Sequence, residues 1–232
     1  CEKNSLWIIN TAQKYIDQHG KNEPFGTLIK EHQPLATKSR HERAAALAPL
    51  LRGLASTDKR MVGHYCDDPI VLDFLARAKH GSLAALGTSC PDHFLRTKVR
   101  PMVVDLPPSA PMDVVVARIK KLHQSYRANY AKYYEKFADA DSPAMRGADP
   151  LVILVPGIGM FSYGPDKKTA RVASEFYINA INVMRGAEAL SSYKPISERE
   201  KFRIEYWALE EAKLQRLPKP KSHATKVAFV TG

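Results

Sequence analysis

The stretch LVILVPGIGMFSYGPDKKTARVASEFYINAINVMRGAEAL, residues 151–190, carries the clearest structural pattern in the chain. Its first five residues form a continuous apolar run bounded by prolines, which predicts a strand covered on both faces. A glycine-rich segment and a helical pattern follow. Gly157, Gly159 and Gly164 have neither dinucleotide-binding nor Walker spacing, so we interpret the segment as a tight turn between strands, or between a strand and a helix. A buried strand among helices predicts a layered α/β fold.

Further strands and helices are predicted on both sides of this stretch. Runs that favour β structure predict two more strands, at 60–65 and at 99–106, and Pro101 favours a sheet edge or a strand start for the second. Helical patterns are predicted at residues 1–20, 39–55, 69–81, 111–137 and 197–216.

Local signals indicate where several of these helices should begin. Ser39 and Ser197 are each followed three residues later by glutamate, which is the spacing of a capping box. Asp68 before Pro69 is a favourable start for a helix that should run to Gly81. Pro49 is expected to bend or divide the helix that contains it.

The helix at 1–20 has an apolar stripe but no partner nearby in the sequence. Gly20 provides its C-terminal stop. The stripe consists of Leu6, Ile9, Ala12, Tyr15 and Ile16. We therefore interpret this helix as the last element of an upstream domain.

Composition excludes some classes of protein. A hydrophobic fraction of 44% is enough for a folded core. No apolar run approaches the roughly 20 residues that span a bilayer, so no membrane association is expected. The net charge of +11 is spread along the chain without a recognised motif, so no nucleic-acid partner is expected. Three cysteines without paired spacing favour free thiols and a cytoplasmic location.

The best candidate site is the segment TSCPDHFLRTK, residues 88–98. It contains Asp92, His93, Arg96 and Lys98. Arginine and lysine commonly anchor phosphate or carboxylate groups, and histidine can move a proton near neutral pH. The alternative interpretation is a structural loop whose charges pair with one another or with solvent.

A metal site has weaker support. His64 and Cys66 could share one face of a short strand, but zinc would need further ligands from elsewhere. His80 and His93 have no predicted place relative to them. The sequence contains no His-x-His or Cys-x-x-Cys pair. We therefore predict no metal ligands and no catalytic residues in this chain.

Four runs resemble one family over essentially the whole chain. They are GTSCPDHFLRTKVRPMVVDL, PGIGMFSYGPDKKTARVASEFYINAINVMRGAEAL, EKFRIEYWALEEAKLQRLPKPK and KVAFVTG. They are similar to the central region of bifunctional rhamnulose-1-phosphate aldolase/alcohol dehydrogenases, which join a class II aldolase to a short-chain dehydrogenase. The resemblance implies a layered α/β/α aldolase-like unit with flanking helices. For the longer protein it implies cleavage of rhamnulose 1-phosphate to dihydroxyacetone phosphate and lactaldehyde, followed by NAD(P)-dependent redox chemistry on lactaldehyde.

The resemblance also implies that neither active site is complete here. Class II aldolases hold zinc with a His-x-His pair and a further histidine before glycine. Pro156 stands where that last histidine would be, and proline cannot ligate a metal. The dehydrogenase motif T-G-x-x-x-G-x-G is represented only by Thr231 and Gly232. Zinc and NAD(P) are therefore expected for the longer protein and no cofactor for this segment.

These interpretations give an expected division of the chain and two functional hypotheses. The expected units are the last helix of an upstream aldolase domain (1–20), a connector and helix (21–59), a degenerate aldolase-like domain (60–192), a helical arm with a basic proline linker (193–225) and the first dehydrogenase strand (226–232). The first hypothesis is a noncatalytic scaffold that positions flanking aldolase and dehydrogenase domains, with homo-oligomers expected. The alternative is a binding unit that holds a phosphorylated ligand at residues 88–98. An aldolase with a metal site rebuilt around His64, His80 or His93 is a third possibility.

Overall fold

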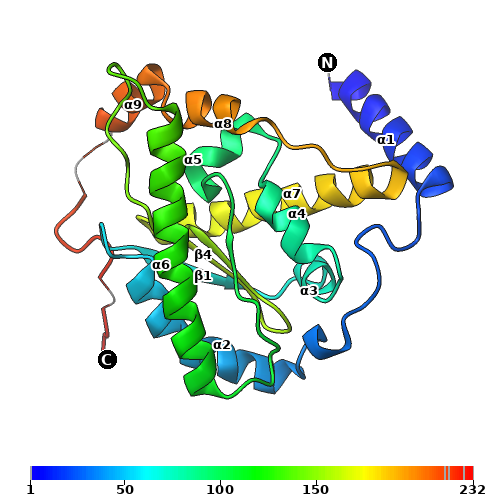
Figure 1. The fold of residues 1–232 in the computed structure, drawn as a ribbon, viewed down its shortest axis with the longest axis horizontal. Coiled ribbons are helices and arrows are strands. Elements are labelled where there is room, and N and C mark those ends of the chain that lie inside the picture. Colours follow the sequence, from blue (N-terminus) through cyan, green and yellow to red (C-terminus); the bar gives the residue numbers. More distant parts are fainter. Residues whose placement is uncertain (1, 217, 219, 227, 232) are drawn as a thin grey trace.

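The computed structural model describes residues 2–216, 218, 220–226 and 228–231, although the side chain of Asp92 is not among the described groups. Nine α-helices, two 3-10 turns and four strands occur in this part of the chain (Figure 1). The helices are α1 (Glu2–His19), α2 (Thr37–Leu54), α3 (Pro69–Leu75), α4 (His80–Leu86), α5 (Phe94–Thr97), α6 (Met112–Phe137), α7 (Lys167–Leu190), α8 (Glu198–Glu205) and α9 (Ala208–Gln215). The 3-10 turns are η1 (Lys30–His32) and η2 (Pro91–His93), and the strands are β1 (Val62–Cys66), β2 (Met102–Val103), β3 (Val152–Val155) and β4 (Gly159–Gly164).

The four strands form one small mixed sheet in the order β1-β4-β3-β2. β4 pairs antiparallel with both β3 and β1, while β2 pairs parallel with β3. β2 is only two residues long, and Pro101 immediately precedes it. The expected edge strand is therefore confirmed, since proline cannot contribute a backbone donor to a sheet.

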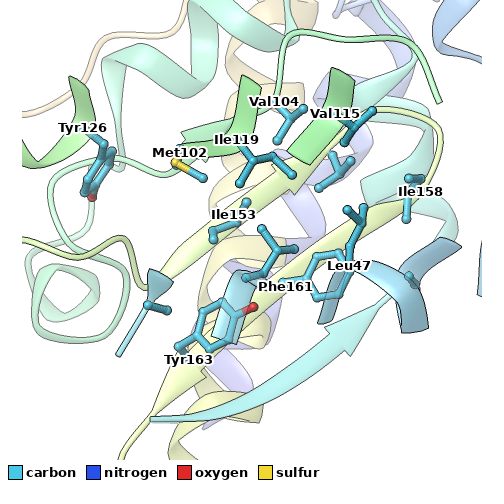
Figure 2. Close-up of a cluster of buried hydrophobic side chains, with 14 residues drawn as sticks. Leu47, Met102, Val104, Val115, Ile119, Tyr126, Ile153, Ile158, Phe161 and Tyr163 are labelled. Atoms are coloured by element: carbon cyan, nitrogen blue, oxygen red, sulfur yellow. The ribbon is translucent and has the colours of Figure 1, made fainter. Parts of the chain in front are cut away.

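Helices cover both faces of the sheet, so β3 is buried on both sides. Ile153 and Val155 face the core formed with α2 and α6, as Figure 2 shows for Ile153 beside Ile119. The alternate residues Val152 and Leu154 belong to the opposite core, which α3, α4 and α7 complete. The predicted layered α/β/α arrangement and the doubly covered strand are both confirmed, because successive side chains of a strand point to opposite faces.

The glycine-rich segment is the turn of the β3–β4 hairpin. Gly157 has φ +69°, a conformation that side chains with a Cβ rarely adopt. The turn is held from outside by two hydrogen bonds: Leu35 N donates to the Gly157 carbonyl at 3.1 Å, and the Tyr65 hydroxyl donates to the Ile158 carbonyl at 2.8 Å. The interpretation as a tight turn between strands is confirmed.

α1 stands away from the layers and contacts only the end of α7 closely (Figure 1). None of its described residues is buried. Lys21 N donates to the Ala189 carbonyl at 2.9 Å, which fixes the chain just after the predicted stop at Gly20. The helix itself is confirmed, and its apolar stripe is exposed in this chain.

The predicted cap of α2 at Ser39 is wrong, and of the two outcomes predicted for Pro49, a bend or a division, the division does not occur. α2 begins at Thr37 with Ala36 as its N-cap, so Ser39 lies inside the helix and does not cap it. Pro49 neither divides nor ends α2, which continues to Leu54. Leu47 and Leu51 are fully buried on either side of Pro49, and this packing holds the helix together despite one missing backbone donor.

Two predicted long helices are each divided into two. The helix expected at 69–81 ends at Leu75, because residues 76–79 instead form hydrogen bonds with the extended segment 25–29. Its start is confirmed, since the Asp68 side chain accepts from Ile70 N at 2.9 Å. The helix expected at 197–216 is capped by Ser197 as predicted, but it ends at Glu205, before the extended residue Trp207.

The strand expected at 226–232 is not formed by residues 226 and 228–231, which have no regular secondary structure. Phe229 and Val230 are 91% and 86% exposed, so they have no sheet to pack against here. Of the helices in the described ranges, none combines the length and the apolar character that crossing a membrane requires.

The hairpin turn generates a stability prediction. A Cβ on Gly157 would lie 2.3 Å from Cγ of Pro108 and 2.8 Å from the Gln33 carbonyl oxygen, at a φ that is itself unfavourable. We expect Gly157→Ala to lower the free energy of unfolding by about 1–3 kcal/mol. Urea unfolding monitored by circular dichroism measures it.

Gly53 in α2 is the matched control, because nothing lies within 4 Å of a Cβ added there. Alanine is the better helix former, so Gly53→Ala should raise the free energy of unfolding by about 0.5–1 kcal/mol. Equal effects of the two variants would show that the turn is not a structural constraint.

Candidate functional site

The predicted ligand segment folds into two short helical turns between α4 and β2. Pro91–His93 forms η2 and Phe94–Thr97 forms α5. Both turns contact α7, the long helix behind the sheet. The segment is therefore part of the layer that covers the sheet.

The predicted ligand residues do not face a common space. His93 is buried, and its ring stacks on Phe176 of α7 with centroids 4.8 Å apart. Arg96 is exposed, whereas Lys98 is buried among residues of other elements. The side chain of Asp92 lies outside the described part of the structure. The fold therefore separates His93, Arg96 and Lys98.

Lys98 is held inside the protein by backbone carbonyls and an aromatic ring. Its Nζ donates to the carbonyls of Gly147 at 2.5 Å and Arg146 at 3.2 Å. It also lies 3.8 Å from the centroid of the Tyr130 ring, a cation–π contact. Burial lowers the pKa of Lys98 to about 8. Lys98 has φ 59°, so these contacts hold a backbone conformation that costs about 1–3 kcal/mol.

Glu205 is the buried acidic group of the same region. Its carboxylate accepts hydrogen bonds from the hydroxyls of Tyr130 at 2.5 Å and Tyr133 at 3.2 Å. The Tyr206 hydroxyl lies 2.7 Å from that of Tyr130, and the Arg146 guanidinium donates to the Glu205 carbonyl. Burial raises the pKa of Glu205, although the nearby Lys98 charge opposes the rise.

We call this set the Lys98–Glu205 cluster. It consists of Lys98, Tyr130, Tyr133, Arg146, Glu205 and Tyr206. The cluster joins α6 to α8 and to the loop before β3. Its charged groups bind protein atoms, so its geometry is that of an internal brace.

A second polar network centres on Asp149, just before β3. The Asp149 carboxylate lies 3.0 Å from Nε2 of His123 and accepts from Thr57 at 2.7 Å and from Arg127. Burial alone would raise the pKa of Asp149, but these hydrogen bonds outweigh burial and hold the pKa well below its usual range. Arg127 also pairs with Asp58, so the network ties the end of α2 to α6.

The histidines proposed for a rebuilt metal site have separate partners. His64 Nδ1 lies 3.3 Å from Lys167 Nζ, and His80 Nδ1 lies 2.8 Å from the Arg77 carbonyl oxygen. His93 stacks on Phe176. In the described ranges, no three side chains of His, Cys, Asp or Glu are placed to share a metal ion. Together with Pro156 in the hairpin turn, this donor set does not fit the zinc of a class II aldolase.

No direct signal in the sequence pointed to the groups whose pKa values are most strongly shifted. Tyr126, Tyr130 and Tyr133 recur at helical spacing within the predicted helix 111–137, which favours core positions, and all three are buried. Their acceptors could not be found, because Glu205 is 75 residues from Tyr130. The one sign in the sequence was the position of this glutamate, on the core-facing side of a predicted amphipathic helix.

The two predicted dehydrogenase residues give no information about a cofactor. Thr231 is exposed and lies in no strand, and Gly232 lies outside the described residues. Binding of NAD(P) therefore stays a prediction for a longer protein.

Comparisons with known proteins identify the type of domain. The family described as the second domain of class II aldolases matches residues 42–214. A Bacillus subtilis (strain 168) protein named uncharacterized oxidoreductase YuxG is 34% identical over 235 residues, covering all of this chain. The chain spans only 34% of that protein's length. No solved structure gives a significant match.

The buried carboxyl group of Glu205 generates a pH prediction. A raised folded pKa means that the folded state binds the proton more tightly, so stability is lost as pH rises above the usual pKa near 4.5. We therefore expect Glu205→Gln to gain stability relative to the parent sequence as pH rises, by at most about 1.4 kcal/mol per pH unit. Urea unfolding at pH 4, 5, 6 and 7 measures the difference.

Glu200→Gln is the control, because Glu200 lies in the same helix and its side chain is 49% exposed. It reports the general effect of removing one carboxylate from α8. A Glu205→Gln difference that stays constant or shrinks with rising pH would contradict the buried, proton-retaining state of Glu205.

Proposed function

This chain belongs to the family of second domains of class II aldolases, and we propose from this that it is a noncatalytic scaffold within a larger bifunctional enzyme. The larger enzyme would cleave rhamnulose 1-phosphate to dihydroxyacetone phosphate and lactaldehyde and convert the lactaldehyde with NAD(P). The relative named as an oxidoreductase supports this proposal, since it is about three times as long as the matched part.

The exposed apolar surface of α1 is the observation that carries the scaffold role. Trp7, Ile8 and Ile9 are 68%, 59% and 61% exposed. Leu6 and Tyr15 are exposed as well, so apolar side chains cover much of the helix. Soluble proteins rarely leave such a contiguous surface open unless it binds a partner.

The few contacts of α1 fit a helix whose exposed face is covered by another domain. Near the end of α1, Ile16 lies close to Gly186 of α7, and Gly20 lies close to Ala189. A helix of this length gains most of its stability from packing, and little packing is available here. We assign the exposed face to the aldolase half of the same longer protein, because two thirds of the relative lies outside the matched segment.

The interior of the domain supports a structural role rather than catalysis. In the Lys98–Glu205 cluster and the Asp149 network, the charged side chains form hydrogen bonds with other groups of the protein. The cluster joins α6 to α8, and the network joins α6 to the end of α2. A domain braced by such internal networks is suited to hold two flanking catalytic domains at a fixed distance from each other.

The first prediction of this proposal concerns catalysis. Purified residues 1–232 should contain substoichiometric zinc and release no dihydroxyacetone phosphate from rhamnulose 1-phosphate, because Pro156 cannot bind a metal. Elemental analysis and a coupled assay for dihydroxyacetone phosphate measure the two quantities. Stoichiometric tight zinc with turnover would overturn the noncatalytic assignment.

The second prediction concerns α1. Amide hydrogen exchange in Glu2–His19 should be fast in the chain of 232 residues and at least about 100-fold slower in the longer protein, where a domain covers the helix. Ile9→Glu in the longer protein should restore fast exchange in α1. The control is Lys14→Glu, which also adds negative charge to α1 but replaces an exposed polar residue outside the apolar stripe.

Equal exchange in the short and long proteins would show that the aldolase half does not cover α1. Protection that appears in the short chain only at high protein concentration would assign the face to a second copy instead. Sedimentation at the same concentrations distinguishes these outcomes.

A further inference from the structure

A cavity of about 190 Å³ lies between α4, the segment before β2 and the start of α8. Leu86 closes it at the end of α4, and Ile196 closes it ahead of α8. Two cationic residues, Arg100 and Lys201, and one acidic residue, Glu198, also line it. The two cations exceed the single carboxylate, and a surplus of positive charge in a small cavity attracts anions.

Lys201 is almost completely enclosed, with 2% of its surface exposed. Its Nζ donates to the Leu86 carbonyl at 2.5 Å, which caps the end of α4. A lysine ammonium has three donors, and within the described residues this carbonyl is its only hydrogen-bond acceptor. Leaving charged donors without acceptors in a buried place is costly, so an acceptor entering the cavity would be stabilised.

Gly87 lies beside this ammonium. It has φ +74°, and a Cβ there would lie 2.0 Å from the Val99 carbonyl oxygen and 3.1 Å from Lys201 Nζ. The close approach of the Val99 backbone therefore requires glycine here, and a side chain would also crowd the ammonium.

Arg100 adds the second positive charge. Burial lowers the pKa of Lys201 to about 8, the charge of Glu198 opposes this, and the charge of Arg100 lowers it further. Neither a hydrogen bond nor an ion pair joins the Arg100 guanidinium to another group in the part of the chain that the structure describes. Glu198 also lines the cavity, but its side chain is 43% exposed and its carboxylate pairs with Lys136 at 3.2 Å. The cavity is therefore positive at neutral pH.

We infer that this cavity binds the phosphate group of a small ligand between Arg100 and Lys201. Phosphate matches the pair because it offers several acceptor oxygens and up to two negative charges. The cavity has room for a phosphate group and a short apolar or hydroxylated tail. This site lies just beyond residues 88–98, and it uses none of Asp92, His93, Arg96 or Lys98. It does not depend on the scaffold role.

Calorimetric titration of the whole chain with inorganic phosphate tests the inference, with ionic strength held constant by sodium chloride at pH 7.5. We expect saturable binding that Arg100→Gln weakens about tenfold or more. Lys201→Met should weaken it as well. Arg96→Gln is the matched control, because Arg96 is an exposed cation of the neighbouring segment, and it should leave the affinity unchanged.

A second measurement uses pH. At pH 9.5 inorganic phosphate is still a dianion, but Lys201 with a pKa of about 8 is largely neutral. Binding should therefore weaken severalfold from pH 7.5 to 9.5, and the weakening should be much smaller in Lys201→Met. Circular dichroism confirms that each variant is folded before titration.

Three outcomes would overturn the inference. They are the absence of saturable binding, equal affinity for acetate, and loss of binding in Arg96→Gln but not in Arg100→Gln. Titration with glycerol 3-phosphate identifies the source of the phosphate group. Tighter binding than inorganic phosphate assigns a phosphate ester, and weaker binding assigns free phosphate.

Discussion

The complete burial of β3 is the constraint on which the rest of the structure depends. Its four residues face two different cores, and each fully buried aliphatic side chain contributes about 1.5–3 kcal/mol. Because both faces are apolar, helices must cover both sides of the sheet. α2 and α6 supply one layer, and α3, α4 and α7 supply the other (Figure 1). The hairpin turn after β3 then fixes the position of β4, and through it β1.

The charged groups of the interior follow from this layering. Once α6 lies on the sheet, its Tyr130 and Tyr133 reach α8, where Glu205 accepts hydrogen bonds from their hydroxyls. Lys98 and Asp149 end up beside the same helix. Burial lowers the pKa of Lys98 and raises that of Glu205, whereas hydrogen bonds lower that of Asp149, and shifted pKa values are often associated with active sites. Here hydrogen bonds to protein atoms account for the placement of these groups. Their shifted pKa values therefore reflect a structural role inside the domain.

The two functional hypotheses rest on two features of the surface, and these features differ in their chemistry. α1 presents apolar side chains that another domain of a longer class II aldolase protein can cover. The cavity at Arg100 and Lys201 presents charge in an enclosed space, which suits a small anion. Neither feature uses the hairpin turn at Pro156. Scaffolding and phosphate binding are compatible in one domain.

The sequence by itself determined the strand at 151–155, its turn, the edge strand after Pro101 and the long helices α1, α6 and α7. These features depend on local period and on the limited conformations of proline and glycine, which act within a few residues. The layered fold followed from them. The sequence could not determine that α2 passes through Pro49 or that the helix after Asp68 stops at Leu75, because buried leucines and the segment 25–29 decide those points. Nor could it place Lys98 or Glu205 in one cluster, or Arg100 and Lys201 around one cavity. Such groups are about 100 residues apart in the chain, and only the packing of the layers brings them together.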